Sequence, residues 1–104
     1  MALDVAASEF VQDDGAYRLQ GEGLTLTSEG LIDTYEAWLS DYPIISIEDG
    51  MAEDDWAGWT ESTRRLGDRV QLVGDDLYTT SPALIRRGIE LQASNAVLIK
   101  LNQI

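Results

Sequence analysis

Cysteine and histidine are both absent from this 104-residue chain, and their absence excludes several kinds of chemistry. Without cysteine there is no disulfide framework and no thiolate nucleophile or metal ligand, which agrees with a reducing compartment. Without histidine there is no Ser–His–Asp triad, no imidazole ligand for a metal, and no general base of the commonest kind. A catalytic or metal-binding site in this chain therefore has to use other side chains.

Basic residues and long apolar runs are also scarce. Seven Lys and Arg stand against 19 Asp and Glu, for a formal charge of -12, which argues against nucleic acid or an anionic membrane surface as a partner. No apolar stretch approaches the ~18 residues of a membrane span, and the first residues lack the features of a signal peptide. Hydrophobic residues still make up 44%, enough for the core of one small domain or of part of a larger one.

Strand and helix patterns alternate along the chain. Short apolar runs predict strands, and apolar residues at helical spacing after a polar cap or a proline predict helices. The predicted strands lie within 2–10, 44–48, 70–75 and 96–101, a short hairpin within 17–26, and helices from 27 or 28 to about 41, from 54 or 55 to about 66, and from 81 onwards, the last with Leu84, Ile85 and Ile89 on its inner face. Alternating strands and helices predict a parallel α/β sheet.

The alternation of side chains within the predicted strands points to a barrel. In each of the last three strands the large apolar residues share one face, and the polar or charged residues, such as Ser46 and Gln71, share the other. A closed (β/α) barrel has such an inner face, whereas an open doubly wound sheet carries helices on both faces. A full barrel takes about 250 residues. We therefore predict a partial (β/α) TIM-type barrel, a half-barrel segment of about four parallel strands with three intervening helices, whose unpaired edges favour association. The residues expected to face the helices are Ile45, Ile47, Val70, Leu72, Val97, Ile99 and Leu101.

Each of the four main apolar runs ends in one charged residue. Asp4 closes MALD, Glu48 closes IISIE, Asp75 closes VQLVGD and Lys100 closes AVLIK. Three carboxylates at one end of a parallel sheet repel one another unless a cation compensates them. Oxygen ligands without histidine or cysteine favour a hard cation. The pattern therefore predicts a Mg²⁺ site formed by Asp4, Glu48 and Asp75, suited to an anionic substrate that carries a carboxylate or a phosphate.

Lys100 lies one predicted strand beyond the three carboxylates. A lysine beside a divalent cation has its ammonium form disfavoured, and its neutral amine can remove a proton from carbon next to a carboxylate. This pattern makes Lys100 the predicted catalytic base, with Glu48, Asp75 and Lys100 as substrate-binding groups. Alternatively, Lys100 neutralises the carboxylates as a structural ion pair. Asp49 and Asp76, which directly follow two predicted ligands, are expected to hydrogen-bond loop amides or to orient those ligands.

Four segments carry a resemblance to a known family. The runs LDVAASEF, YPIISIEDG, LGDRVQLVGDDL and AVLIKLNQI resemble enolases, the phosphopyruvate hydratases of glycolysis, and the match covers essentially the whole chain. The metal-ligand positions of that family fall on Asp4, Glu48 and Asp75. Its catalytic lysine falls on Lys100.

The resemblance implies a Mg²⁺-dependent interconversion of 2-phosphoglycerate and phosphoenolpyruvate, in which Lys100 abstracts the C2 proton. It implies that residues 1–104 are a single segment of the C-terminal barrel domain, supplying strands three to six, with the N-terminal domain absent. It also implies a homo-oligomer in the cytoplasm, with bacterial members also found at the cell surface or secreted. The acid-catalysis glutamates and other substrate-binding groups of the family lie outside this segment, so the isolated chain is expected to be inactive.

Two other functions agree with the same residues. Acid-sugar dehydratases and racemases of the wider enolase superfamily also place carboxylates on three successive strands. A half-barrel without catalysis could instead serve as a binding module. The SIEDG and GDDL segments favour enolase itself.

Overall fold

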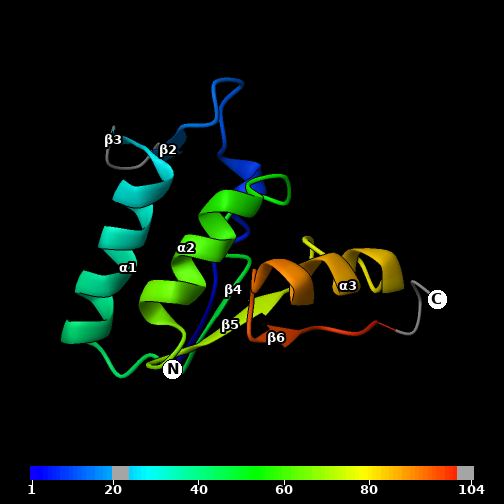
Figure 1. Ribbon diagram of the computed structural model, residues 1–104. Helices are drawn as coiled ribbons and strands as arrows, with labels where there is room; N and C mark the ends of the chain where they lie inside the picture. The colour runs from blue at the N-terminus through cyan, green and yellow to red at the C-terminus, as the bar shows by residue number, and fades with distance from the viewer. Residues whose placement is uncertain (20–23, 101–104) are drawn as a thin grey trace.

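A parallel four-stranded sheet with three helices on one side forms the body of the protein (Figure 1). The computed structural model describes residues 1–19 and 24–100. The strand order is β1-β4-β5-β6, and one helix lies in each of the three connections between successive strands of this sheet, so the prediction of a partial (β/α) barrel is confirmed. The elements are β1 (Ala2–Asp4), the 3-10 helix η1 (Ala7–Glu9), β2 (Tyr17–Leu19), β3 (Leu24–Leu26), α1 (Ser28–Asp41), β4 (Ser46–Glu48), α2 (Trp56–Leu66), β5 (Gln71–Gly74), α3 (Pro82–Leu91) and β6 (Ala96–Val97).

The three helices begin where the sequence places polar caps. Thr27 accepts the N–H of Gly30 at 3.1 Å, and Asp55 accepts the N–H of Gly58 at 2.9 Å. Ser81 caps α3, with Pro82 at the first helical position. A side-chain oxygen at this position satisfies one of the backbone N–H groups that a helix leaves unpaired at its start. The predicted hairpin is also present, since β2 and β3 pair in antiparallel fashion.

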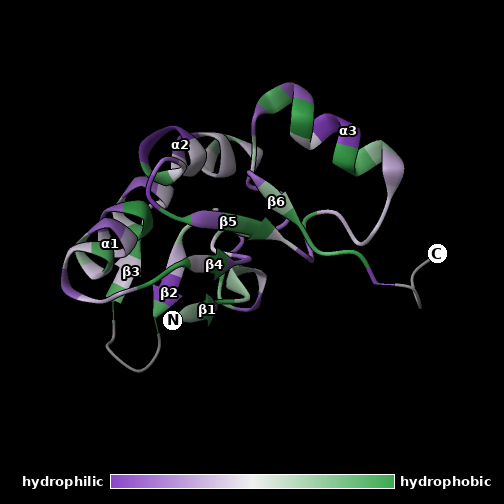
Figure 2. Ribbon diagram, turned by 90° about the horizontal axis from the view of Figure 1, so that it is seen from below, coloured by the Kyte–Doolittle hydropathy of each residue, from purple (hydrophilic) through white to green (hydrophobic). Residues whose placement is uncertain are grey.

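The core lies between the sheet and the helices. Figure 2 shows α1, α2 and α3 in an arc on the same side of the sheet. Ile47 from β4 and Leu72 from β5 are buried beneath them, as the alternation predicted. From the helices, the buried side chains that meet this face are Leu31, Ile32, Tyr35, Trp59 and Leu66. The three helices thus cover the apolar face of the sheet and do not cover its charged face. Among the described residues, no helix is long and apolar enough to cross a membrane.

Four apolar residues expected to face the helices or the core are exposed instead. Ile45 precedes β4 and is 68% exposed, and Ile89 of α3 is 72% exposed. The buried residue of α3 is Gly88, and the ring of Tyr78 packs against it. Ile89 is the next residue and is turned by about 100° around the helix, away from this contact. Strand β6 is shorter than predicted, and Val97 and Ile99 also remain exposed. Leu101, predicted on the same face, lies outside the described residues.

The register of the strands is staggered toward the C-terminal side of the sheet. Asp4 pairs with Glu48, but Glu48 pairs with Val73, so Asp75 lies two positions further along its strand. Val73 in turn pairs with Ala96. Such a stagger accompanies the tilt of strands in a barrel. A shift of two residues keeps every side chain on its own face, so the charged residues still point to the same side.

Candidate metal centre

The predicted site residues gather at the carboxyl edge of the sheet. Asp4 is the last residue of β1, Glu48 is the last residue of β4, and the two are register partners. Asp75 directly follows β5, and Lys100 lies three residues after the end of β6. All four residues thus lie at one edge, because the carboxyl ends of parallel strands meet at the same edge of a sheet.

The carboxylates at this edge fall into two overlapping groups. Oxygens of Asp4, Glu48 and Asp49 lie within 4.8 Å of one another, and so do oxygens of Asp49, Asp75 and Asp76. Within the described chain, Asp4, Glu48 and Asp75 do not form a group of that spacing by themselves. The two-residue stagger between β4 and β5 accounts for this separation, because it moves Asp75 along the sheet. The predicted ligand set therefore stays a prediction.

Asp75 has one carboxylate oxygen with a partner and one without. Its Oδ2 lies 2.8 Å from Lys100 Nζ, while Oδ1 is buried and is the one such side-chain atom in residues 1–19 and 24–100 that makes no hydrogen bond. The residue as a whole is 6% exposed. A buried oxygen without a partner costs free energy, and a cation is a partner that it can take. A hard-oxygen ligand of this kind fits Mg²⁺.

Lys100 contacts the same edge through its side chain and its backbone. The ion pair with Asp75 raises the pKa of the Lys100 ammonium above its usual value. Its backbone N–H donates to Thr80 Oγ1 at 3.0 Å. In this form Lys100 is a cation that neutralises Asp75, which is the structural ion pair named above as the alternative to a base. A cation bound to Asp75 would repel the ammonium and disfavour its charged form.

Electrostatic repulsion at this edge is visible at Glu48. Burial raises the pKa of the Glu48 carboxyl, and the charges of Asp4, Asp49 and Asp75 raise it further, while Lys100 lowers it. One nearby ammonium thus compensates the carboxylates incompletely. Positive charge placed among these residues would favour their ionised forms.

Asp49 connects the two carboxylate groups. Its Oδ1 accepts the N–H of Asp75 at 2.9 Å, and both of its oxygens accept the N–H of Asp76 at 3.1 Å. The expectation that Asp49 hydrogen-bonds loop amides is confirmed. Burial raises the pKa of Asp49, although these N–H groups act in the opposite direction. Asp76 is exposed and donates its N–H to this contact.

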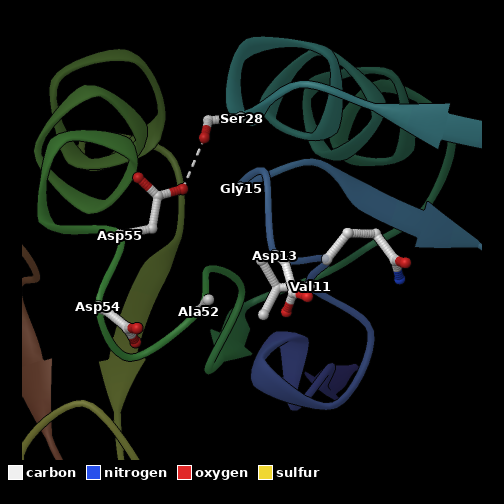
Figure 3. A pocket seen from close by; sticks show the side chains of 8 residues that line it. Val11, Asp13, Gly15, Ser28, Ala52, Asp54 and Asp55 are labelled. Atoms are coloured by element: carbon white, nitrogen blue, oxygen red, sulfur yellow. Dashed lines mark hydrogen bonds between the residues drawn. The ribbon is translucent and has the colours of Figure 1, made fainter.

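A second polar cluster, centred on Asp55, lies beside this edge. The sequence predicted only the role of Asp55 as a helix cap. Asp55, predicted as a helix cap, also accepts the hydroxyl of Tyr17 at 2.7 Å. It accepts the hydroxyl of Ser28 at 2.6 Å as well (Figure 3). Tyr17 in turn accepts the N–H of Ala52 at 2.8 Å. None of the predicted site residues lines the pocket at this cluster. A buried tyrosine that bonds to one acidic residue produces no periodic pattern, so these bonds could not be predicted from the sequence.

Comparison with known proteins supports the assignment that the geometry suggests. The family model for the enolase C-terminal TIM barrel domain matches residues 1–104. The chain is 57% identical over 104 residues to the curated enolase of Wolinella succinogenes, covering 100% of this chain and 25% of that protein. The chain thus spans about a quarter of the length of this relative. On both grounds, this chain belongs to the enolase family.

Proposed function

We propose that residues 1–104 are one segment of an enolase barrel domain and supply its metal ligands and its base. The reaction is the Mg²⁺-dependent interconversion of 2-phosphoglycerate and phosphoenolpyruvate in glycolysis. The observation that carries this proposal is at Asp75, where a buried oxygen without a hydrogen-bond partner lies on the same carboxylate that holds Lys100. The proposed cation ligand and the proposed base are thus neighbours.

Each residue has a proposed task. Asp4, Glu48 and Asp75 would hold the ion, and Glu48, Asp75 and Lys100 would face the substrate. Lys100, once neutral, would take the proton from the carbon next to the substrate carboxylate. Mg²⁺, when bound, would stabilise the negative charge that develops on the substrate oxygens. The distance of 2.8 Å between Lys100 Nζ and Asp75 Oδ2 supports this proposal, because it brings the proposed base next to a proposed metal ligand.

The assembly and location of the protein are proposed on the family relationship. We propose a homo-oligomer that acts in the cytoplasm, with the surface display or secretion of some bacterial enolases as a further location. The exposed side chains of Ile89 and Ile99 agree with burial against further protein.

Titration of the chain with Mg²⁺ in a calorimeter tests the metal site. We expect binding by the parent chain and a clear loss of affinity in Asp4→Ala, Glu48→Ala and Asp75→Ala. If all three variants bind the ion as well as the parent does, these residues do not form the site.

Absorbance of the enol product tests turnover. With 2-phosphoglycerate and Mg²⁺ we expect none from the 104-residue chain alone, because the acid-catalysis groups implied by the family lie outside it. Measurable turnover by this chain would show that those groups are dispensable.

A further inference from the structure

We propose that Asp49 is a positioning residue whose carboxylate fixes the backbone that carries Asp75, and so sets the affinity of the site for Mg²⁺. This inference rests on the proposed metal site and assigns a task to a residue outside the predicted ligand set. Asp49 is 3% exposed and belongs to both carboxylate groups at the edge. Both of its oxygens already accept backbone N–H groups, which suits a residue that orients ligands.

The stagger of the sheet explains why a side chain is needed at this point. The last backbone hydrogen bond between the two strands runs from the N–H of Asp49 to the carbonyl of Val73, at 2.9 Å. Asp75 lies beyond that bond, and its N–H finds Asp49 Oδ1 instead. The carboxylate thus continues the pairing of β4 with β5 past the end of the backbone ladder, up to the residue that carries the unpartnered oxygen.

Asp49 is held from the other side as well. Its carbonyl accepts the N–H of Ala7 at 2.9 Å, in the segment that follows β1. One residue therefore bonds to the chain beyond β1 and to the chain beyond β5, while it directly follows Glu48 in β4. The ends of all three ligand-bearing strands meet in its hydrogen bonds.

The backbone of Asp49 agrees with a constrained position. Its φ is 48°, in the left-handed region that most residues with a side chain avoid and that Asp and Asn tolerate better. Such a conformation persists when its surroundings determine it, as the bonds to Ala7, Val73 and Asp75 do here. Replacement by Asn preserves this tolerance and the approximate shape, but puts an NH₂ group where one of the two accepting oxygens was.

The test compares Mg²⁺ affinities of parent, Asp49→Asn, Asp76→Asn and Asp75→Ala by calorimetry, with urea unfolding of each chain in Mg²⁺-free buffer. We expect Asp49→Asn to weaken binding by roughly tenfold, within the range for residues that orient ligands. The neighbouring variant Asp76→Asn removes the same charge without removing an acceptor for these amides, and is expected to weaken binding much less. An equal loss in both variants would assign the effect to local charge and overturn the inference.

The outcomes separate this inference from the proposed function. If Asp75→Ala binds Mg²⁺ as well as the parent, the proposed site fails. If Asp75→Ala loses binding while Asp49→Asn keeps it, the site stands and the positioning role is wrong. Amide hydrogen exchange on the parent gives a reading that needs no variant, since the N–H groups of Asp75 and Asp76 are expected to be protected. Free exchange at both amides would contradict the inference even if Asp49→Asn failed to fold.

Discussion

Two carboxylates in this molecule differ in how fully their oxygens are partnered. At Asp55, Oδ1 accepts from the N–H of Gly58, and Oδ2 accepts from the hydroxyls of Tyr17 and Ser28. At Asp75, Oδ2 pairs with Lys100 and the buried Oδ1 accepts from nothing in the described chain. The first carboxylate completes its interactions within the fold, whereas the second retains capacity for a ligand.

Structural and functional acids within this small domain differ in whether their oxygens all have hydrogen-bond partners. Both residues follow strands of the same parallel sheet in a chain with 19 acidic residues, so acidity alone does not distinguish them. Hydrogen-bond satisfaction does, because an unpartnered buried oxygen costs stability and is retained where function uses it. Removal of Asp55 should therefore damage folding, and removal of Asp75 should damage binding.

The largest expected effect is on stability, in Asp55→Ala. This change removes the α2 cap and leaves the hydroxyls of Tyr17 and Ser28 without their acceptor. We expect a loss of about 2 to 4 kcal/mol in the free energy of unfolding, measured with urea. Asp54→Ala next to it removes an exposed carboxylate and should change that free energy by less than about 0.5 kcal/mol. Similar values for the two variants would show that the cluster has no special role.

Asp75→Ala should give the opposite result. We expect Mg²⁺ affinity to fall by roughly 100-fold, at or beyond the upper end of the loss seen for residues that only support ligands. Without the metal, the free energy of unfolding should change by less than about 1 kcal/mol, because Oδ1 has no partner to lose and the ammonium that pairs with Oδ2 belongs to a side chain that is 41% exposed. Calorimetry and urea unfolding measure the two quantities. A severe loss of stability with unchanged affinity would reverse the comparison.

Gly58, which lies next to Asp55 in α2, shows how closely the Asp55 cluster is packed. A Cβ on Gly58 would meet a carboxylate oxygen of Asp55 and lie 2.7 Å from Met51 Cε. Helix propensity favours Gly58→Ala by about 1 kcal/mol, but overpacking costs about 1 to 3 kcal/mol, so a net destabilisation is expected. In α1, a Cβ added at Gly30 would lie no closer than 3.4 Å to the nearest atom. Gly30→Ala should therefore raise the free energy of unfolding by about 0.5 kcal/mol. If thermal melting shows the same change for both, crowding at Gly58 is not decisive.

The smallest expected effect is a change in Mg²⁺ affinity on substitution of Lys100, the ion-pair partner of Asp75. Lys100→Met removes the ammonium that competes with a cation for Asp75 Oδ2, so Mg²⁺ affinity should rise by a few-fold. Lys100→Arg keeps the positive charge and should leave the affinity near that of the parent. Calorimetry at one pH compares the three chains. A fall in affinity for Lys100→Met would mean that the lysine assists the metal site in its protonated form.

Much of this arrangement was predictable because it follows from local pattern. Cap residues such as Thr27, Asp55 and Ser81 fixed the starts of the helices within one residue of the observed positions. The alternation of apolar and polar residues placed Ile47 and Leu72 in the core. These features depend on neighbours in the chain, which a sequence displays directly.

The parts that were missed depend on contacts between distant segments. Ile89 was assigned to the core by its spacing, but α3 packs through Gly88 against Tyr78, which periodicity does not reveal. The sequence pattern predicted Glu48 and Asp75 at one end of the sheet but not the register between their strands, which offsets the two residues by two positions. The hydrogen bonds of Asp55 with Tyr17 and Ser28 join segments 38 and 27 residues away in the chain.

The two-residue offset between β4 and β5 also limits how this edge can change through insertion and deletion. One residue gained or lost inside β5 would rotate Asp75 by half a turn toward the helices, with Lys100 losing its partner. Two residues gained or lost would slide Asp75 along the strand and leave it on the same side of the sheet. Length changes in this strand are therefore tolerable in even steps, and odd ones should be confined to the loops between strand and helix.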